Sequence, residues 1–378
     1  MRTVSAIKNI NSTLIVYGLN MVLQFIIRFV LLYYLSIEYL GLNGLFDNIL
    51  TVLSLTELGI GPAIIFSLYA PLANHDLETA KSIMRIFKKA YIYIGTLILF
   101  LGLCISPFVQ YLIKVPPNIA YLNIFFLLFV VDTGISYFYS YKKCLLIADQ
   151  KQYIANYYRG ITQLIGSLFQ IALVILTHSF WVYIILRICM TFSENFLIAR
   201  KADHLYSFLN EKNIQPLNKD IYQNIIRNIK ALILHKIGGV TVFGTSNIIL
   251  SKFVGLSAVA LYTNYYLIIN GIDKLSDQVF NALKASVGNL NESHDDAHKL
   301  VIFKRLEFMT AYLACFICSN LYLLLNPFIT IWLGNSYRFD ESIVLWMVIN
   351  FYLMFMRKGV LVFKDAMGLF WQNRYMSL

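Results

Sequence analysis

A small set of charged side chains lies inside apolar stretches of this sequence. The basic members are Arg28, Arg187 and Lys236, and the acidic members are Glu57, Asp132 and Asp273. A charge near the centre of a membrane-spanning helix costs about 2.5–3.5 kcal/mol, so such residues usually face a polar cavity or an oppositely charged partner. Guanidinium groups hold phosphate oxygens in a fork, whereas a carboxylate holds a proton or a cation. These residue types therefore predict a site that binds anions and ions.

Each basic candidate has two interpretations. Arg28 would bind the phosphate groups of a ligand in a central cavity, or it would extend to the outer membrane interface. Arg187 either lines the same cavity or pairs with Glu194, two turns further along the same helix. Lys236, near the start of an apolar run, either contacts the ligand or anchors its helix at the interface. The sequence leaves these alternatives open.

Glu57 directly precedes a predicted break in a helix. Gly59, Gly61 and Pro62 follow it and form a predicted hinge, because they release backbone groups from helical pairing. A carboxylate beside such a break would bind a coupling proton or sodium ion, or it would cap the freed amide groups. Both interpretations of Glu57 remain open.

Two further acids are candidates for ion coupling. Asp132 lies within an apolar run. Asp273 follows Glu57 by 216 residues, a spacing at which other segments of the chain recur, although the adjacent Lys274 would also neutralise it. Asp47, in contrast, is predicted to lie at the outer interface.

The composition places the chain in a lipid bilayer. Hydrophobic residues make up 58% of the 378 residues and charged residues 13%, whereas a soluble domain has about 25% charged residues. Apolar stretches long enough to cross about 30 Å of hydrocarbon recur throughout. We expect an all-α polytopic membrane protein with ten spans, at residues 13–35, 44–69, 91–113, 119–140, 157–177, 179–199, 231–251, 257–282, 306–333 and 342–363.

The basic residues predict the orientation of these spans. Twenty-four lysines and arginines fall in the segments that we assign to the cytoplasm, and only Lys114, Lys252 and Arg338 fall on the opposite side. This bias predicts a multi-pass membrane protein with both termini in the cytoplasm. The net charge of +11 is therefore explained by membrane orientation, and no nucleic-acid partner is predicted.

Nothing in the sequence indicates an enzyme, a metal site or a cofactor. The predicted external connections are short and carry no Ser/His/Asp arrangement, phosphate loop or paired metal-binding acids. His294 and His298 have a metal-like spacing, but they fall in a polar segment where a solvated loop is expected.

Weak internal repeats divide the chain into two related halves. Leu40-Gly41-Leu42 returns as Val254-Gly255-Leu256, and residues 72–89 and 141–153 return near 290–305 and 363–375. Repeats of this length in an apolar chain are typical of transporters built from two parallel bundles. We expect a six-helix lobe at 1–201, a cytoplasmic linker at 202–230 and a lobe of four helices at 231–378. The second lobe is expected to lack its last two helices.

Residues 53–64 read Leu-Ser-Leu-Thr-Glu-Leu-Gly-Ile-Gly-Pro-Ala-Ile, and further distinctive runs occupy 39–46, 142–153, 255–265 and 285–290. These segments resemble the polysaccharide (Wzx-type) flippases of the multidrug/oligosaccharidyl-lipid/polysaccharide exporter superfamily. The resemblance covers nearly the whole chain. It implies a transporter, without covalent chemistry, that moves polyprenyl diphosphate-linked oligosaccharide repeat units across the inner membrane by alternating access, for O-antigen or capsule synthesis.

The same resemblance implies further partners and alternatives. Membrane lipid and a polysaccharide polymerase are the expected partners besides the lipid-linked oligosaccharide. A multidrug antiporter of the same fold and a truncated, inactive flippase are the alternatives. An antiporter for cationic drugs would favour an acidic cavity, whereas Arg28 and Arg187 are basic.

Overall fold

The protein is all-helical over the residues that the computed structural model describes, which are 2–57, 60–115, 119–211, 244–293 and 296–367 with scattered positions between 217 and 229. Within these residues, seven helices are long and apolar enough to cross a membrane, so the chain is a multi-pass membrane protein. They lie at Asn11–Tyr34, Leu77–Leu112, Leu122–Ala148, Gln152–Thr177, Phe180–Leu205, Ala297–Leu333 and Glu341–Lys364. The arrangement of six and four spans stays a prediction.

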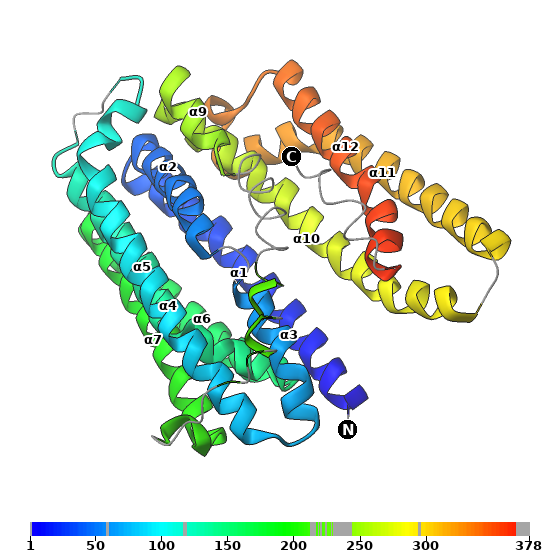
Figure 1. The fold of residues 1–378 in the computed structure, drawn as a ribbon. Coiled ribbons are helices and arrows are strands. Elements are labelled where there is room, and N and C mark those ends of the chain that lie inside the picture. Colours follow the sequence, from blue (N-terminus) through cyan, green and yellow to red (C-terminus); the bar gives the residue numbers. More distant parts are fainter. Residues whose placement is uncertain are drawn as a thin grey trace. The chain divides into compact units, whose positions relative to one another are not determined.

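Two compact units make up the chain, Met1–Val259 and Ala260–Met376. In the first, the long helices run side by side (Figure 1), with α1 against α6, and α5 between α4 and α7. Its helices are α1 (Arg2–Tyr34), α2 (Ile37–Leu53), α3 (Ile60–Ala73), α4 (Leu77–Ile105), α5 (Leu122–Ala148), α6 (Gln152–Thr177), α7 (Phe180–Leu205) and α9 (Ser246–Phe253). The second unit contains most of α10 (Leu256–Ser293), with α11 (Asp296–Leu333) and α12 (Glu341–Ala366).

The predicted span 44–69 is divided in the structure. Helix α2 ends at Leu53, a 3-10 turn covers Ser54–Glu57, and α3 begins at Ile60. Pro62 lies in the first turn of α3, where its missing N–H removes no helical hydrogen bond. A Cβ atom on Gly61 would lie 3.0 Å from Tyr91 Oη and 3.2 Å from Glu57 Oε1, so this position favours glycine. Gly59 lies outside the described residues.

Helix α4 begins earlier than the predicted span 91–113. Asp76 caps its N-terminus, because the Asp76 side chain accepts a hydrogen bond from the Thr79 amide at 3.0 Å. The hydrogen bonds from Thr79 hold the pKa of Asp76 below its usual value. The cap fixes the register of a 29-residue helix whose first turns are polar and whose later turns are apolar.

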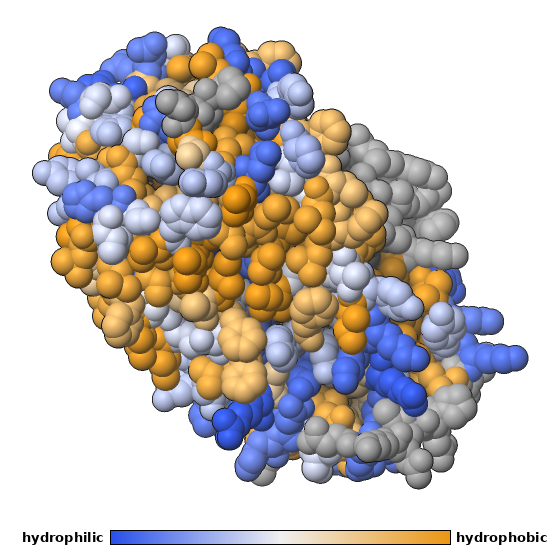
Figure 2. Space-filling view, turned by 90° about the vertical axis from the view of Figure 1, so that its left-hand side faces the viewer, coloured by the Kyte–Doolittle hydropathy of each residue, from blue (hydrophilic) through white to orange (hydrophobic). Residues whose placement is uncertain are grey.

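Large apolar side chains cover much of the surface. Phe100, Leu103, Ile165, Leu168 and Phe169 are all more than half exposed. The face drawn in Figure 2 shows a band of hydrophobic side chains between hydrophilic ends. An exposed apolar surface of this kind is expected of a protein whose solvent is the bilayer core.

Close packing of α4 on α5 depends on small residues and gives a first prediction. A Cβ atom on Gly102 would lie 2.4 Å from Cγ1 and 2.6 Å from Cγ2 of Val130, which is itself buried. We expect Gly102→Ala to lower the free energy of unfolding by roughly 1–3 kcal/mol, because the two helices must separate. Thermal unfolding of the purified protein in detergent measures this change. Gly18→Ala on α1 is the matched control, since nothing lies within 4 Å of its Cβ position. Equal melting temperatures for the two variants would contradict the prediction.

The second unit has its own hydrophobic core. Tyr265 of α10 is fully buried and packs with side chains of α11 and α12, including Leu325 and Phe355. Helix α10 is not among the seven apolar spans, and its sequence mixes asparagines and acids with apolar residues.

Candidate functional site

A polar cavity of about 540 Å³ opens within the first unit. Its lining comes from α1, α2, α5, α6 and α7, and it includes three of the six charged candidates from the sequence, Arg28, Asp132 and Arg187. Charged side chains in the lining are Arg28, Asp47, Asp132, Arg159 and Arg187. An enclosed polar space inside an apolar bundle is where membrane proteins place ligands and ions.

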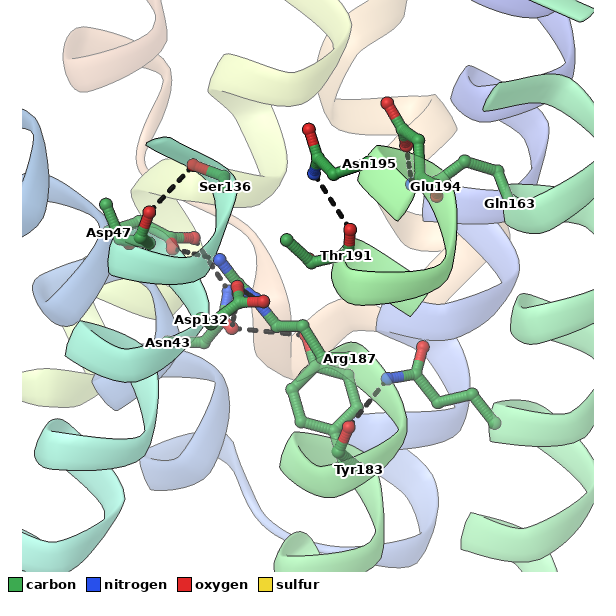
Figure 3. A network of polar contacts seen from close by, with 12 residues as sticks. Asn43, Asp47, Asp132, Ser136, Gln163, Tyr183, Arg187, Thr191, Glu194 and Asn195 are labelled. Carbon is green, nitrogen blue, oxygen red and sulfur yellow. Dashed lines mark hydrogen bonds and ion pairs between the residues drawn. The ribbon is translucent and has the colours of Figure 1, made fainter. Parts of the chain in front are cut away.

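Arg187 is the centre of a network that joins three helices (Figure 3). Its Nε donates to Asp132 Oδ2 at 2.9 Å, its Nη2 to Asp47 Oδ1 at 2.8 Å and its Nη1 to Asn43 Oδ1 at 3.1 Å. The guanidinium carbon also lies 4.4 Å from the centroid of the Phe129 ring. The planar fork of arginine allows all these contacts at once, which a lysine would not make.

The groups of α2 that accept hydrogen bonds from Arg187 lie on one face of that helix. Asn43 and Asp47 lie one turn apart on α2, and Asn43 Nδ2 donates to Asp47 Oδ2 at 3.2 Å. Tyr183, one turn before Arg187 on α7, donates its hydroxyl to Asn43 Oδ1 at 3.1 Å. Two residues of α2, Asn43 and Asp47, thus bind two residues of α7. The members of each pair are four residues apart on their own helix, so each pair lies on one helix face.

Asp132 retains an unused acceptor. Its side chain is 8% exposed, and among the described atoms its Oδ1 is buried without a hydrogen-bond partner. Its other oxygen is held by Arg187. Asp132 therefore keeps one buried carboxylate oxygen that none of the described hydrogen bonds uses.

One alternative from the sequence is wrong. Arg187 does not pair with Glu194, which instead lies 3.9 Å from Arg159 Nε and accepts from Gln163 Nε2 at 3.4 Å. Asp47 belongs to the network and to the cavity lining, and its position at the outer interface stays a prediction. The i, i+4 spacing of Asn43 and Asp47 indicates a polar face on α2, but it does not identify the helix that this face meets.

Arg28 lines the same cavity from α1. Arg28 and Arg187 therefore line one cavity, and the role of Arg28 in binding a ligand stays a prediction. Amide side chains also line the cavity, from Asn20 and Gln24 of α1 and from α6. Primary amides donate and accept hydrogen bonds, which is the pairing that sugar hydroxyls require.

Glu57 lies outside this lining, at the break between α2 and α3. Its Oε1 accepts from Tyr91 Oη at 3.2 Å and its Oε2 from Tyr137 Oη at 3.3 Å. The acid at the hinge is therefore connected to α4 and α5 by two phenol groups. Its role in ion coupling stays a prediction.

The remaining candidates lie elsewhere. Asp273 pairs with Lys358 of α12, whose Nζ is 2.9 Å from Asp273 Oδ1 and also contacts Asp277. Lys274, the neighbour expected to neutralise Asp273, instead reaches Asp277 Oδ2 at 4.0 Å. Lys236 lies outside the described residues.

Comparison with known proteins gives the fold. No family model matches the sequence, and no curated protein matches it. Among solved structures, an inward-facing multidrug resistance MATE family transporter of the MOP superfamily superposes with a TM-score of 0.65 at 14% identity, over 96% of this chain and 84% of that one. An outward-facing structure of such a transporter gives 0.55 at 12% identity, over 98% and 85%. A MATE in a bent conformation gives 0.57 at 11% identity, over 99% and 84%. The chain therefore has the fold of these transporters.

Proposed function

We propose that this chain is a transporter of the bacterial cytoplasmic membrane that flips polyprenyl diphosphate-linked oligosaccharide repeat units by alternating access. The observation that carries the proposal is that Arg28 and Arg187 line one polar cavity. Guanidinium groups bind diphosphate oxygens through paired, charge-assisted hydrogen bonds. The polyprenyl chain would remain in the bilayer, against the exposed apolar surface, while the headgroup crosses.

The shape and lining of the cavity support an oligosaccharide diphosphate as the ligand. A volume of about 540 Å³ lies within the range of about 300–1,000 Å³ typical of small-molecule sites. The arginines supply cationic contacts at one end of the ligand, and the amides of α1 and α6 supply hydrogen bonds to neutral hydroxyl groups. A polysaccharide polymerase would then consume the product on the outer face.

A multidrug antiporter is the second candidate, and one observation favours it. The solved structures that share the fold include multidrug resistance transporters, and Asp47 and Asp132 put two acids in the cavity. Three arginines and two aspartates line the cavity, so the formal charge of its lining is +1. Both acids are also bound to Arg187. This balance favours an anionic headgroup over a cationic drug.

Translocation in proteoliposomes separates these functions. A fluorescent polyprenyl diphosphate-linked oligosaccharide should become accessible to an external quencher faster in vesicles that contain the protein than in empty vesicles. Export of surface glycan in a strain that lacks its own polysaccharide flippase is the cellular test. Uptake of a cationic dye against a proton or sodium gradient, without flipping of the oligosaccharide lipid, would replace the proposal by the antiporter.

Glu57 is the acid we propose for ion coupling at the hinge formed by Gly59, Gly61 and Pro62. Glu57 links the segment between α2 and α3 to α4 and α5, because its two carboxylate oxygens accept hydrogen bonds from Tyr91 and Tyr137. A change in its protonation or ion binding would therefore reach three segments of the bundle. We expect Glu57→Gln to remove the dependence of translocation on an imposed proton or sodium gradient while leaving exchange without a gradient. The measurement is flipping in proteoliposomes with and without the gradient, and an unchanged gradient response would contradict the role.

A further inference from the structure

A second pocket, of about 460 Å³, lies on the outside of the first unit at the beginning of α4. Its basic lining residues are Lys81, Arg85, Lys88 and Lys89, and its apolar wall contains Met84, Ile92 and Leu209. It shares no lining residue with the central cavity. The basic side chains occur at spacings of four, three and one, which place them along one face of the helix.

The charges of this pocket are unequal. Lys81 is 4% exposed and already paired, with its Nζ 2.8 Å from Glu78 Oε1 and 2.6 Å from Glu211 Oε2. Arg85, Lys88 and Lys89 are exposed, and none of them forms an ion pair with a residue that the structure describes. Glu211, the acid in the lining, is held by Lys81. Three cations that no described acid neutralises therefore face the pocket and would attract an anion.

The position of the pocket along α4 identifies the kind of anion. Immediately after Lys89, the exposed side chains of α4 become apolar, with Ile92 at 42%, Tyr93 at 77% and Phe100 at 60% exposed. The cations thus lie at the edge of the apolar surface, the depth at which the phosphates of a bilayer leaflet lie. Basic pockets between helices at this depth bind anionic lipid headgroups.

We propose that this pocket is a binding site for the phosphodiester headgroup of an anionic phospholipid. Arg85, Lys88 and Lys89 bind the phosphate, and the first acyl carbons lie along Ile92 and the apolar surface of α4 that follows. A lipid bound there contacts α4, α5 through Tyr141, and the segment after α7 through Leu209. The site is separate from the proposed transport cavity, and the inference does not depend on the proposed function.

Lipid binding to the full-length protein in detergent tests the site. Native mass spectrometry during titration with phosphatidylglycerol and with phosphatidylcholine gives the two dissociation constants. Each basic group near a phosphate surface contributes roughly a fivefold gain in affinity, so we expect phosphatidylglycerol to bind at least about tenfold more tightly than phosphatidylcholine. The triple variant Arg85→Gln, Lys88→Gln, Lys89→Gln should bind the two lipids equally.

A control with the same residue types is available on α11. Lys299→Gln, Lys304→Gln, Arg305→Gln removes one arginine and two lysines from another helix. This control should leave the preference for phosphatidylglycerol within about twofold of the parent, a change smaller than one lost cation. Equal losses in the two triple variants would show general surface attraction and overturn the site.

Competition by two further ligands shows whether the pocket binds a phospholipid, a free phosphate ester or a polyprenyl diphosphate. Glycerol phosphate in solution should not compete at concentrations that match phosphatidylglycerol, because it lacks the acyl contacts; equal competition would overturn the choice of a lipid. Polyprenyl diphosphate displacing phosphatidylglycerol at lower concentration would assign the pocket to the carrier lipid and overturn the proposal.

A single variant covers the case in which the α4 triple variant does not purify as a monodisperse species. Lys88→Gln alone should weaken the affinity for phosphatidylglycerol about fivefold. An unchanged affinity would equally refute the site.

Discussion

Replacing Arg28 by alanine should abolish translocation of the oligosaccharide lipid while leaving the protein folded and in the membrane. Arg28 lines the central cavity from α1, and its proposed partner is the diphosphate. A charge-assisted hydrogen bond contributes about 1.5–3 kcal/mol, and 1.4 kcal/mol corresponds to a factor of ten. Loss of one or two such bonds predicts a fall in initial flipping rate of about a hundredfold at subsaturating substrate.

Two variants make the Arg28 experiment specific. Arg28→Lys keeps the charge but not the fork and should retain part of the activity, because lysine binds phosphate as a point charge. Arg200→Ala removes an exposed arginine of α7 that is outside the cavity lining, and it should flip at the parental rate. Normal flipping by Arg28→Ala, with normal expression, would remove Arg28 from the binding site.

Replacing Arg187 by glutamine should have the largest effect on stability. The side chain of Asp132 is 8% exposed and that of Arg187 is 27% exposed. Removing one partner of a buried ion pair costs about 3–5 kcal/mol, because the other charge stays buried without compensation. We place the loss near the lower limit, about 3 kcal/mol, because Asp47 is 43% exposed and water partly solvates it. Thermal unfolding in detergent measures this loss.

Neutralising the acids should reverse the effect. Combining Arg187→Gln with Asp47→Asn and Asp132→Asn leaves neither carboxylate without its cation and should recover most of the lost stability. Glu194→Gln is the control, because Glu194 was the partner suggested by sequence alone and its contact with Arg159 is long and partly exposed. It should change the free energy of unfolding by no more than about 1 kcal/mol. An equal loss for Glu194→Gln and Arg187→Gln would contradict the network.

Much of the helix pattern could be predicted from hydrophobicity. Six predicted spans correspond closely to α1, α5, α6, α7, α11 and α12. The expected span 44–69 is two helices in the structure, because α2 ends at Leu53 and α3 begins at Ile60; the hinge role of Gly59, Gly61 and Pro62 stays a prediction. Helix ends were less predictable, since polar turns extend a helix beyond the apolar run, as the Asp76 cap does at the start of α4.

The partner of Arg187 could not be predicted from the chain alone. Glu194 lies seven residues further on, about 10 Å along the helix axis, which is too far for a direct ion pair. The partners that form come from α2 and α5, and their identity depends on how the faces of packed helices are rotated towards one another. Hydrophobic periodicity is a weak guide to that rotation in a bilayer, where lipid-facing and buried surfaces are both apolar.

The two carboxylates on Arg187 also set how strongly the central cavity would retain its cargo. An incoming phosphate would have to share a guanidinium that already satisfies Asp47 and Asp132, so each new bond would replace part of an existing one. Such exchange makes capture modest in strength and departure correspondingly fast. A carrier gains from this arrangement, because cargo held too tightly would never leave on the far side.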